Sequence, residues 1–141
     1  MPYREKVAWL SLLAMAVVFI PYFTWTALNP PTEALPNLGR MAAYAVTCGV
    51  WLAILGTGHL VLRRFAPDEA RQPLDERDLA IRHRARNVAY GVLMAGMILV
   101  GCVMPFTDTG WKIVNAAVFM IIVAEAVHDA TVIVGYRRHL A

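Results

Sequence analysis

The stretch that decides the fold is residues 41–62, MAAYAVTCGVWLAILGTGHLVL, which contains no Asp, Glu, Lys or Arg. A helix needs roughly 20 mostly apolar residues to cross the hydrocarbon core of a bilayer. Three more stretches meet this requirement, at 7–28, 88–104 and 111–134. The sequence therefore predicts a single all-α domain, residues 1–141, that is an integral membrane four-helix up-down bundle.

The overall composition excludes several other classes of protein. The 141 residues are 59% hydrophobic and only 16% charged, whereas soluble domains carry about a quarter charged residues. Such an apolar chain is not disordered, and two cysteines are too few for a disulfide scaffold. The pI near 9.1 would suit a nucleic-acid binder, but we expect no nucleic-acid partner because membrane topology explains the basic residues.

Basic residues lie mostly on one side of the predicted spans. All but two of the 13 Lys and Arg residues belong to the two termini or to the connection 63–87; the exceptions are Arg40 and Lys112. Basic residues are enriched in cytoplasmic connections. We therefore expect both termini and the connection 63–87 to be cytoplasmic, and the protein's surroundings to be the lipid bilayer with its anionic head groups.

Small residues recur at four-residue steps in three of the spans, which allows close helix packing. We expect this packing to lie within the bundle, with a homodimer interface as the alternative. The residues concerned are Ala45, Gly49 and Ala53, then Gly91 and Ala95, then Ala126 and Ala130.

The connection before the third span ends in an acidic motif followed by arginines. Asp75 is suited to cap a helix and Asp78 to complete a capping box, so the third helix is predicted to begin near Glu76 in the cytoplasm. Arg77 lies among the acids and Arg82 follows them, and acids in the first turn with arginines after them suit the helix dipole. This motif is also the candidate surface for a protein partner.

Two segments carry a resemblance to a known family. Residues 3–9, YREKVAW, and residues 74–78, LDERD, which lead into Ala89 and Tyr90, resemble a family of small, uncharacterised four-helix bacterial inner-membrane proteins with a DERD-like motif at the start of the third helix. The resemblance implies a location in the bacterial cytoplasmic membrane and carries no established activity.

Ionisable residues near the end of the fourth span are not required by topology. Glu125, His128 and Asp129 share one helical face, and ionisable groups inside a span are costly and usually functional. Other polar residues are predicted at the same level of the membrane. They are His59, His83, Arg86, Asn87 and Tyr90.

Three interpretations of this cluster compete. The first is a structural ion-pair network of Arg82 and Arg86 with Glu125 and Asp129. The second is a metal site, because Glu125 and His128 have the Glu-x-x-His spacing of di-iron helices, although a matching pair on a second helix is missing. The third is a site for a proton, a small ligand or a phosphate head group, with a role in transport among its uses.

No motif of a known enzyme class occurs in the chain, so an enzyme is not favoured and we expect no cofactor. Haem bound between His59 and His128 is a disfavoured alternative, because both histidines lie near the cytoplasmic edge of the membrane. We expect an accessory or regulatory membrane protein that acts through its cytoplasmic connection. The alternative is a cytoplasm-facing polar site built from the cluster of ionisable residues.

Overall fold

The computed structural model describes residues 2–30 and 37–138. These residues form helices, and no strand occurs among them. The elements are α1 (Tyr3–Leu28), α2 (Leu38–Phe65), the short α3 (Pro67–Arg71), α4 (Glu76–Ile98) and α5 (Gly110–Arg138); a π-helical turn (Leu99–Val103) and a 3₁₀ turn (Met104–Phe106) extend α4. The predicted all-α fold with four long apolar helices is confirmed, since four of these helices are long and apolar enough to cross a membrane by length and composition.

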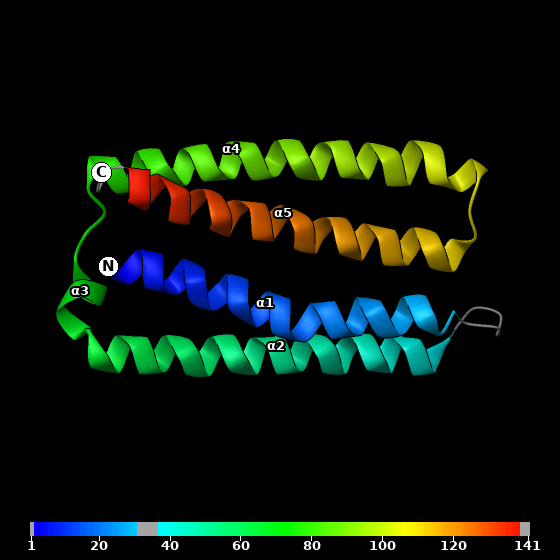
Figure 1. Cartoon of the computed structure of the whole chain (residues 1–141), viewed down its shortest axis with the longest axis horizontal. Helices are drawn as coiled ribbons and strands as arrows, with labels where there is room; N and C mark the ends of the chain where they lie inside the picture. The colour runs from blue at the N-terminus through cyan, green and yellow to red at the C-terminus, as the bar shows by residue number, and fades with distance from the viewer. Residues whose placement is uncertain (1, 31–36, 139–141) are drawn as a thin grey trace.

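The four long helices lie side by side in a row, in the order α4, α5, α1, α2 (Figure 1). Each helix packs along its neighbours in this row, whereas α2 and α4, both fully described, share no extended interface. In a closed four-helix bundle α2 and α4 would also pack together. The connection between them contains α3 and is not a tight turn, so nothing in the covalent chain forces α2 against α4.

Buried side chains occupy the interfaces of α1, α4 and α5. One cluster joins Ala8, Ile81, Ala85, Val132, Ile133 and Tyr136, and a second is built from Met15, Phe19 and Tyr22 of α1. No residue of α2, which the structure describes in full, is buried. The helix is therefore a peripheral member of the row, held by one face against α1.

Two of the three small-residue ladders do not lie where internal packing would need them. Ala45, Gly49 and Ala53 of α2 are exposed, as are Gly91 and Ala95 of α4, so the internal-packing interpretation is wrong for these two ladders. In the third ladder Ala126 packs against the second cluster, whereas Ala130 is exposed. Spacing marks a face of a helix but not the neighbour that covers it.

Other glycines make the close contacts. A Cβ on Gly96 would lie 2.8 Å from Cγ of Met120, and one on Gly135 would lie 2.8 Å from Cγ2 of Ile81. The α4–α5 interface therefore depends on glycines that the four-residue pattern did not single out.

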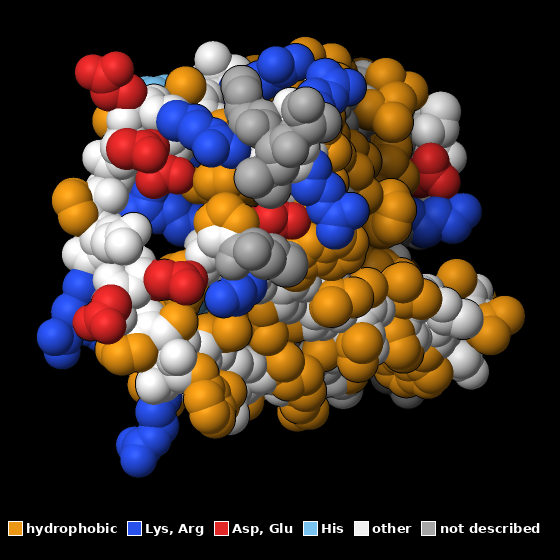
Figure 2. Space-filling view, turned by 60° about the vertical axis from the view of Figure 1, so that its left-hand side comes forward, with side chains coloured by type: hydrophobic (Ala, Val, Ile, Leu, Met, Phe, Trp, Pro, Cys, Tyr) orange, Lys and Arg blue, Asp and Glu red, His pale blue; other side chains and the backbone are white. Residues whose placement is uncertain are grey.

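Charged side chains gather at one end of the row. Both ends of the described chain and α3 lie there (Figure 1), and we name it the α3 end. Turned toward the viewer, this end shows Lys, Arg, Asp and Glu side chains, with hydrophobic side chains covering the flanks behind it (Figure 2). The opposite end, which holds the connection between α4 and α5, is named the far end.

Replacing Gly96 by Ala tests the close contact between α4 and α5. The added methyl group would overlap Met120, and overpacking of this kind costs about 1–3 kcal/mol. We expect Gly96→Ala to lower the free energy of unfolding by this amount, measured by thermal or denaturant unfolding in detergent micelles.

Gly91→Ala is the matched control on the same helix. A Cβ at Gly91 meets nothing within 4 Å, and Ala is up to about 1 kcal/mol more favourable than Gly in a helix. This variant should be neutral or stabilised. Equal destabilisation of both variants would contradict the packing described.

Candidate functional site

The acidic motif is built into the start of α4. Asp75 is its N-cap, and its carboxylate accepts a hydrogen bond of 2.7 Å from the backbone N–H of Asp78. The carboxylate of Asp78 in turn accepts one of 3.4 Å from the N–H of Asp75. These two bonds satisfy backbone donors that the first turn of a helix leaves free.

Asp78 also ties three helices together at the α3 end. Its carboxylate accepts hydrogen bonds from the guanidinium of Arg4 on α1 and from the hydroxyl of Tyr136 on α5. Beside it, Nε of Arg137 lies 3.2 Å from the carboxylate of Glu5, a residue only 2% exposed. We name the three residues Arg4, Asp78 and Tyr136 the Asp78 clasp.

The clasp shifts the pKa values of its members, which lie outside the predicted spans. Burial alone would raise the pKa of Asp78, but the hydrogen bond from Tyr136 and the charge of Arg4 outweigh it and hold that pKa below its ordinary value. Burial and the hydrogen bond to Asp78 raise the pKa of Tyr136 to about 12. The favoured state is therefore an ionised Asp78 with a neutral Tyr136.

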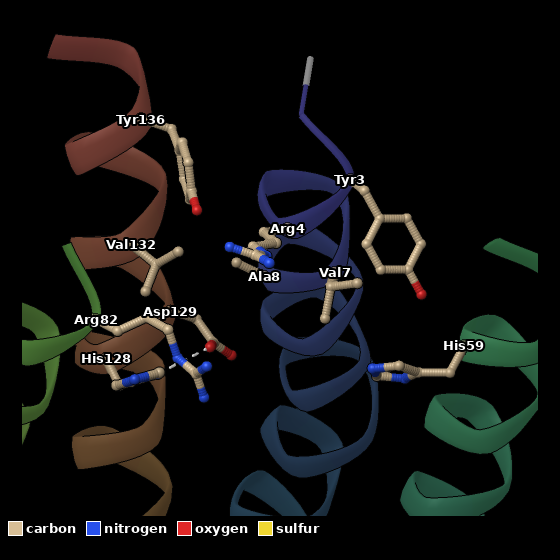
Figure 3. Close-up of a pocket in the computed structure, with 10 residues that line it drawn as sticks. All are labelled: Tyr3, Arg4, Val7, Ala8, His59, Arg82, His128, Asp129, Val132 and Tyr136. Atoms are coloured by element: carbon tan, nitrogen blue, oxygen red, sulfur yellow. Dashed lines mark hydrogen bonds and ion pairs between the residues drawn. The ribbon is translucent and has the colours of Figure 1, made fainter. Parts of the chain in front are cut away.

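A cavity of about 280 Å³ lies next to the clasp, and each of the four long helices contributes to its wall. Figure 3 shows its side chains between α5, α1 and α2. Val7, Ala8 and Val132 supply apolar surface. The polar lining residues are Tyr3, Arg4, His59, Arg82, His128, Asp129 and Tyr136.

Asp129 is the buried acid of this cavity. It is 7% exposed, and one carboxylate oxygen lies 3.2 Å from Nδ1 of His128. The other oxygen, Oδ2, is buried and has no hydrogen-bond partner among the described residues. A buried polar atom without a partner is costly, so this oxygen marks a place where a ligand's N–H or O–H group would be stabilised.

The positive groups of the cavity come from different helices. Arg82 on α4 makes no ion pair with any described residue, whereas Arg4 is already engaged by Asp78. His59 reaches the cavity from α2. The lining thus offers cationic or neutral donors together with one acceptor, which suits a ligand that has both an anionic group and a hydrogen-bond donor.

The cavity brings together only part of the predicted cluster. His59, His128 and Asp129 line it, joined by Arg82 from the acidic motif. The remaining predicted residues do not line it, and all of them are exposed. They are Glu125, His83, Arg86, Asn87 and Tyr90.

The predicted network of Arg86 with Glu125 or Asp129 is not formed. Over the residues described, neither Arg82 nor Arg86 pairs with either acid. The reason is that α4 turns Ile81 and Ala85 toward α5, which leaves the arginines beside the interface and not in it. The ion pairs that join the long helices at this end are those of Asp78 and Glu5, and Lys6 of α1 also lies 3.6 Å from the carboxylate of Glu69 in α3.

Sequence reasoning missed Tyr3, Arg4 and Tyr136 as members of the site. Arg4 was expected only as one of the basic residues of the termini that mark the cytoplasmic side. The position of these three residues opposite Asp78, at the same predicted level of the membrane, was the available signal. The metal interpretation gains no support, because no group of three His, Cys, Asp or Glu residues within the described ranges could hold a metal ion.

Comparisons of the chain with models of protein families, with characterised proteins and with solved structures give no match.

Replacing Tyr136 by Phe tests the clasp. A hydrogen bond to a charged group contributes about 1.5–3 kcal/mol, so Tyr136→Phe should lower the free energy of unfolding by that amount at neutral pH. Because the pKa of Tyr136 is raised from 10.0 to about 12, its contribution is complete below pH 10 and is lost as the pH rises through 12. The stability of the wild-type protein should therefore approach that of the variant over this interval, measured by thermal unfolding in detergent.

The control is Tyr90→Phe, since the side chain of Tyr90 is 62% exposed and outside the clasp. This variant should keep the wild-type stability and pH dependence. A constant difference between wild type and Tyr136→Phe from pH 8 to pH 12 would contradict the clasp.

Proposed function

We propose that the chain is a four-pass protein of the bacterial cytoplasmic membrane, with its helices crossing alternately and the α3 end in the cytoplasm. The four long apolar helices support the membrane location. Exposed apolar side chains such as Leu13, Val17, Leu52 and Leu60 would face lipid tails. The basic residues at the α3 end support its cytoplasmic side.

A labelling experiment tests this orientation. With Cys48 and Cys102 replaced by Ser, single cysteines are introduced at Glu69 in α3 and at Thr109 between α4 and α5, both exposed. A membrane-impermeant maleimide should label Thr109→Cys in intact cells and Glu69→Cys only after the membrane is opened. The reverse pattern, or labelling of both positions in intact cells, would contradict the proposal.

We further propose that the cavity beside the Asp78 clasp binds the head group of a phospholipid. The observation that carries this proposal is the buried Oδ2 of Asp129, which has no partner among the described residues and belongs to the wall of the cavity. In the proposed orientation Asp129 lies about two helical turns from Tyr136, close to the cytoplasmic head-group level. A lipid can therefore reach it from the inner leaflet.

The lining residues define the chemistry of the head group. Arg82 and His59 would bind the phosphate, and Asp129 would accept a hydrogen bond from an ammonium or hydroxyl group beyond it. The apolar surface of Val7 and Val132 suits the first part of an acyl chain. Because α2 and α4 do not pack against each other, the acyl chain of the lipid could extend from the cavity into the bilayer.

Native mass spectrometry of the purified protein, with defined lipids added, tests this function. We expect phosphatidylethanolamine and phosphatidylglycerol, whose head groups have donors beyond the phosphate, to bind several-fold more strongly than phosphatidylcholine, which has none. Arg82→Gln should weaken binding of all three about tenfold, the effect of a lost charged hydrogen bond. Asp129→Leu should abolish the preference over phosphatidylcholine.

Arg86→Gln is the matched control, because Arg86 lies one turn further along α4, is exposed and does not line the cavity. Its lipid binding should equal that of the wild type. Glycerophosphoethanolamine, the same head group without acyl chains, should bind far more weakly than the lipid. Equal loss in Arg82→Gln and Arg86→Gln, or no preference among the three lipids, would contradict the proposal.

An accessory role through the cytoplasmic connection is a second candidate. Asp75 and Asp78 are engaged within the protein, so they offer little to a partner. Phe65, at the end of α2, is 83% exposed, and Leu74, next to the start of α4, is 39% exposed. A protein partner would contact one of these two positions, with Glu76 beside Leu74.

A further inference from the structure

A second cavity lies at the far end, away from the head-group site. Its volume is about 270 Å³, and α1, α2 and α5 form its wall. Tyr22, Tyr44 and Trp111 supply aromatic surface, and Arg40 and Asn115 supply polar groups. No Asp or Glu is among the described residues that line it.

Arg40 is held in place by aromatic rings and by the backbone. Its guanidinium carbon lies 4.3 Å from the ring centroid of Trp25 and 5.8 Å from that of Trp111. Nη2 donates a hydrogen bond to the carbonyl of Asn29. These two cation–π contacts and the hydrogen bond hold the guanidinium at the edge of the cavity.

The other terminal nitrogen, Nη1, is buried and has no hydrogen-bond partner within the described part of the chain. Oδ1 of Asn115, on α5, is in the same condition. A buried cationic donor without an acceptor is far more costly than a neutral one. The residues that line the cavity thus include one cationic donor and one neutral acceptor that both lack a partner among the described residues.

We propose that this cavity binds a small organic acid from the non-cytoplasmic side. Its carboxylate accepts a hydrogen bond from Nη1 of Arg40, and a hydroxyl or N–H group on its body donates to Oδ1 of Asn115. The aromatic and aliphatic wall encloses the apolar part of the molecule. The class that satisfies both atoms is a short-chain hydroxy acid, and this site is independent of the head-group site.

The competing occupant is a carboxylate of the chain itself. Glu33 is the only acidic residue between α1 and α2, in the connection outside the described residues. If its side chain filled the position beside Arg40, an added acid would bind only after Glu33 was changed.

Isothermal titration calorimetry of the full chain in a neutral detergent distinguishes these cases. Three probes of equal chain length are used: 2-hydroxyhexanoate, hexanoate, which lacks the hydroxyl group, and hexane-1,2-diol, which lacks the carboxylate. We expect the hydroxy acid to bind most tightly, hexanoate several-fold more weakly, and the diol not measurably. This comparison needs no variant, so it stands even if a substitution at Arg40 prevents folding.

Variants then assign the contacts. Arg40→Gln should weaken the binding of 2-hydroxyhexanoate at least about tenfold. Asn115→Leu should make the affinities for 2-hydroxyhexanoate and hexanoate equal. Lys112→Gln is the matched control, since Lys112 is the other basic residue of this end, pairs with Asp108 at 3.3 Å and has a side chain 65% exposed. It should bind as the wild type does.

Three outcomes would overturn the proposal. They are binding of the diol as tight as that of the acids, unchanged binding in Arg40→Gln, and binding that appears only in Glu33→Gln. The last outcome would identify Glu33 as the group that neutralises Arg40.

Discussion

The arrangement of the helices depends on one carboxylate, that of Asp78. It closes the first turn of α4 and binds Arg4 of α1 and Tyr136 of α5. In lipid, helices gain little from burying apolar surface against one another, so polar contacts and close backbone approach determine how they pack. The clasp sets the relative height of three helices, and Gly96 and Gly135 then let α4 and α5 approach closely. The clasp does not include α2, which among the long helices packs extensively only on α1.

The open row has a direct consequence for function. If α2 packed against α4, side chains would cover the wall of α1 and α5 that carries Asp129. Because α2 does not pack there, the cavity that Asp129 lines is not covered by α2 side chains, as the proposed head-group site requires. The two cavities lie at opposite ends of the row. Among the residues that line each cavity, one has a buried polar atom without a partner in the described part of the chain: Oδ2 of Asp129 in one and Nη1 of Arg40 in the other. In the proposed orientation, one candidate site therefore lies on each side of the membrane.

The sequence predicts what local chemistry determines. Helix length follows from the run of apolar residues, and the capping box of Asp75 and Asp78 from spacing within one turn. Which helices pack against each other is not determined locally, because the exposed small residues around Gly49 have the same spacing as small residues in a packed interface. The Arg86 pairing failed for the same reason, since the rotation of α4 about its axis is set by Ile81 and Ala85 against α5. Three residues of the predicted cluster line one cavity: His128 and Asp129 of α5 and His59 of α2, which the two helices direct toward α1.

The most direct test of the open row in a membrane is a nitroxide scan along residues 41–62 of α2, in lipid nanodiscs and with both native cysteines replaced. Oxygen, which concentrates in the hydrocarbon, and a water-soluble nickel chelate serve as relaxants. An open row of membrane-spanning helices predicts high oxygen and low nickel accessibility around α2. One protected stripe should run through Tyr44, Cys48, Trp51 and Gly58, which face α1. A second protected stripe would show that α2 also packs against α4, and nickel accessibility along the whole helix would show that it does not cross the membrane; either result would contradict the account.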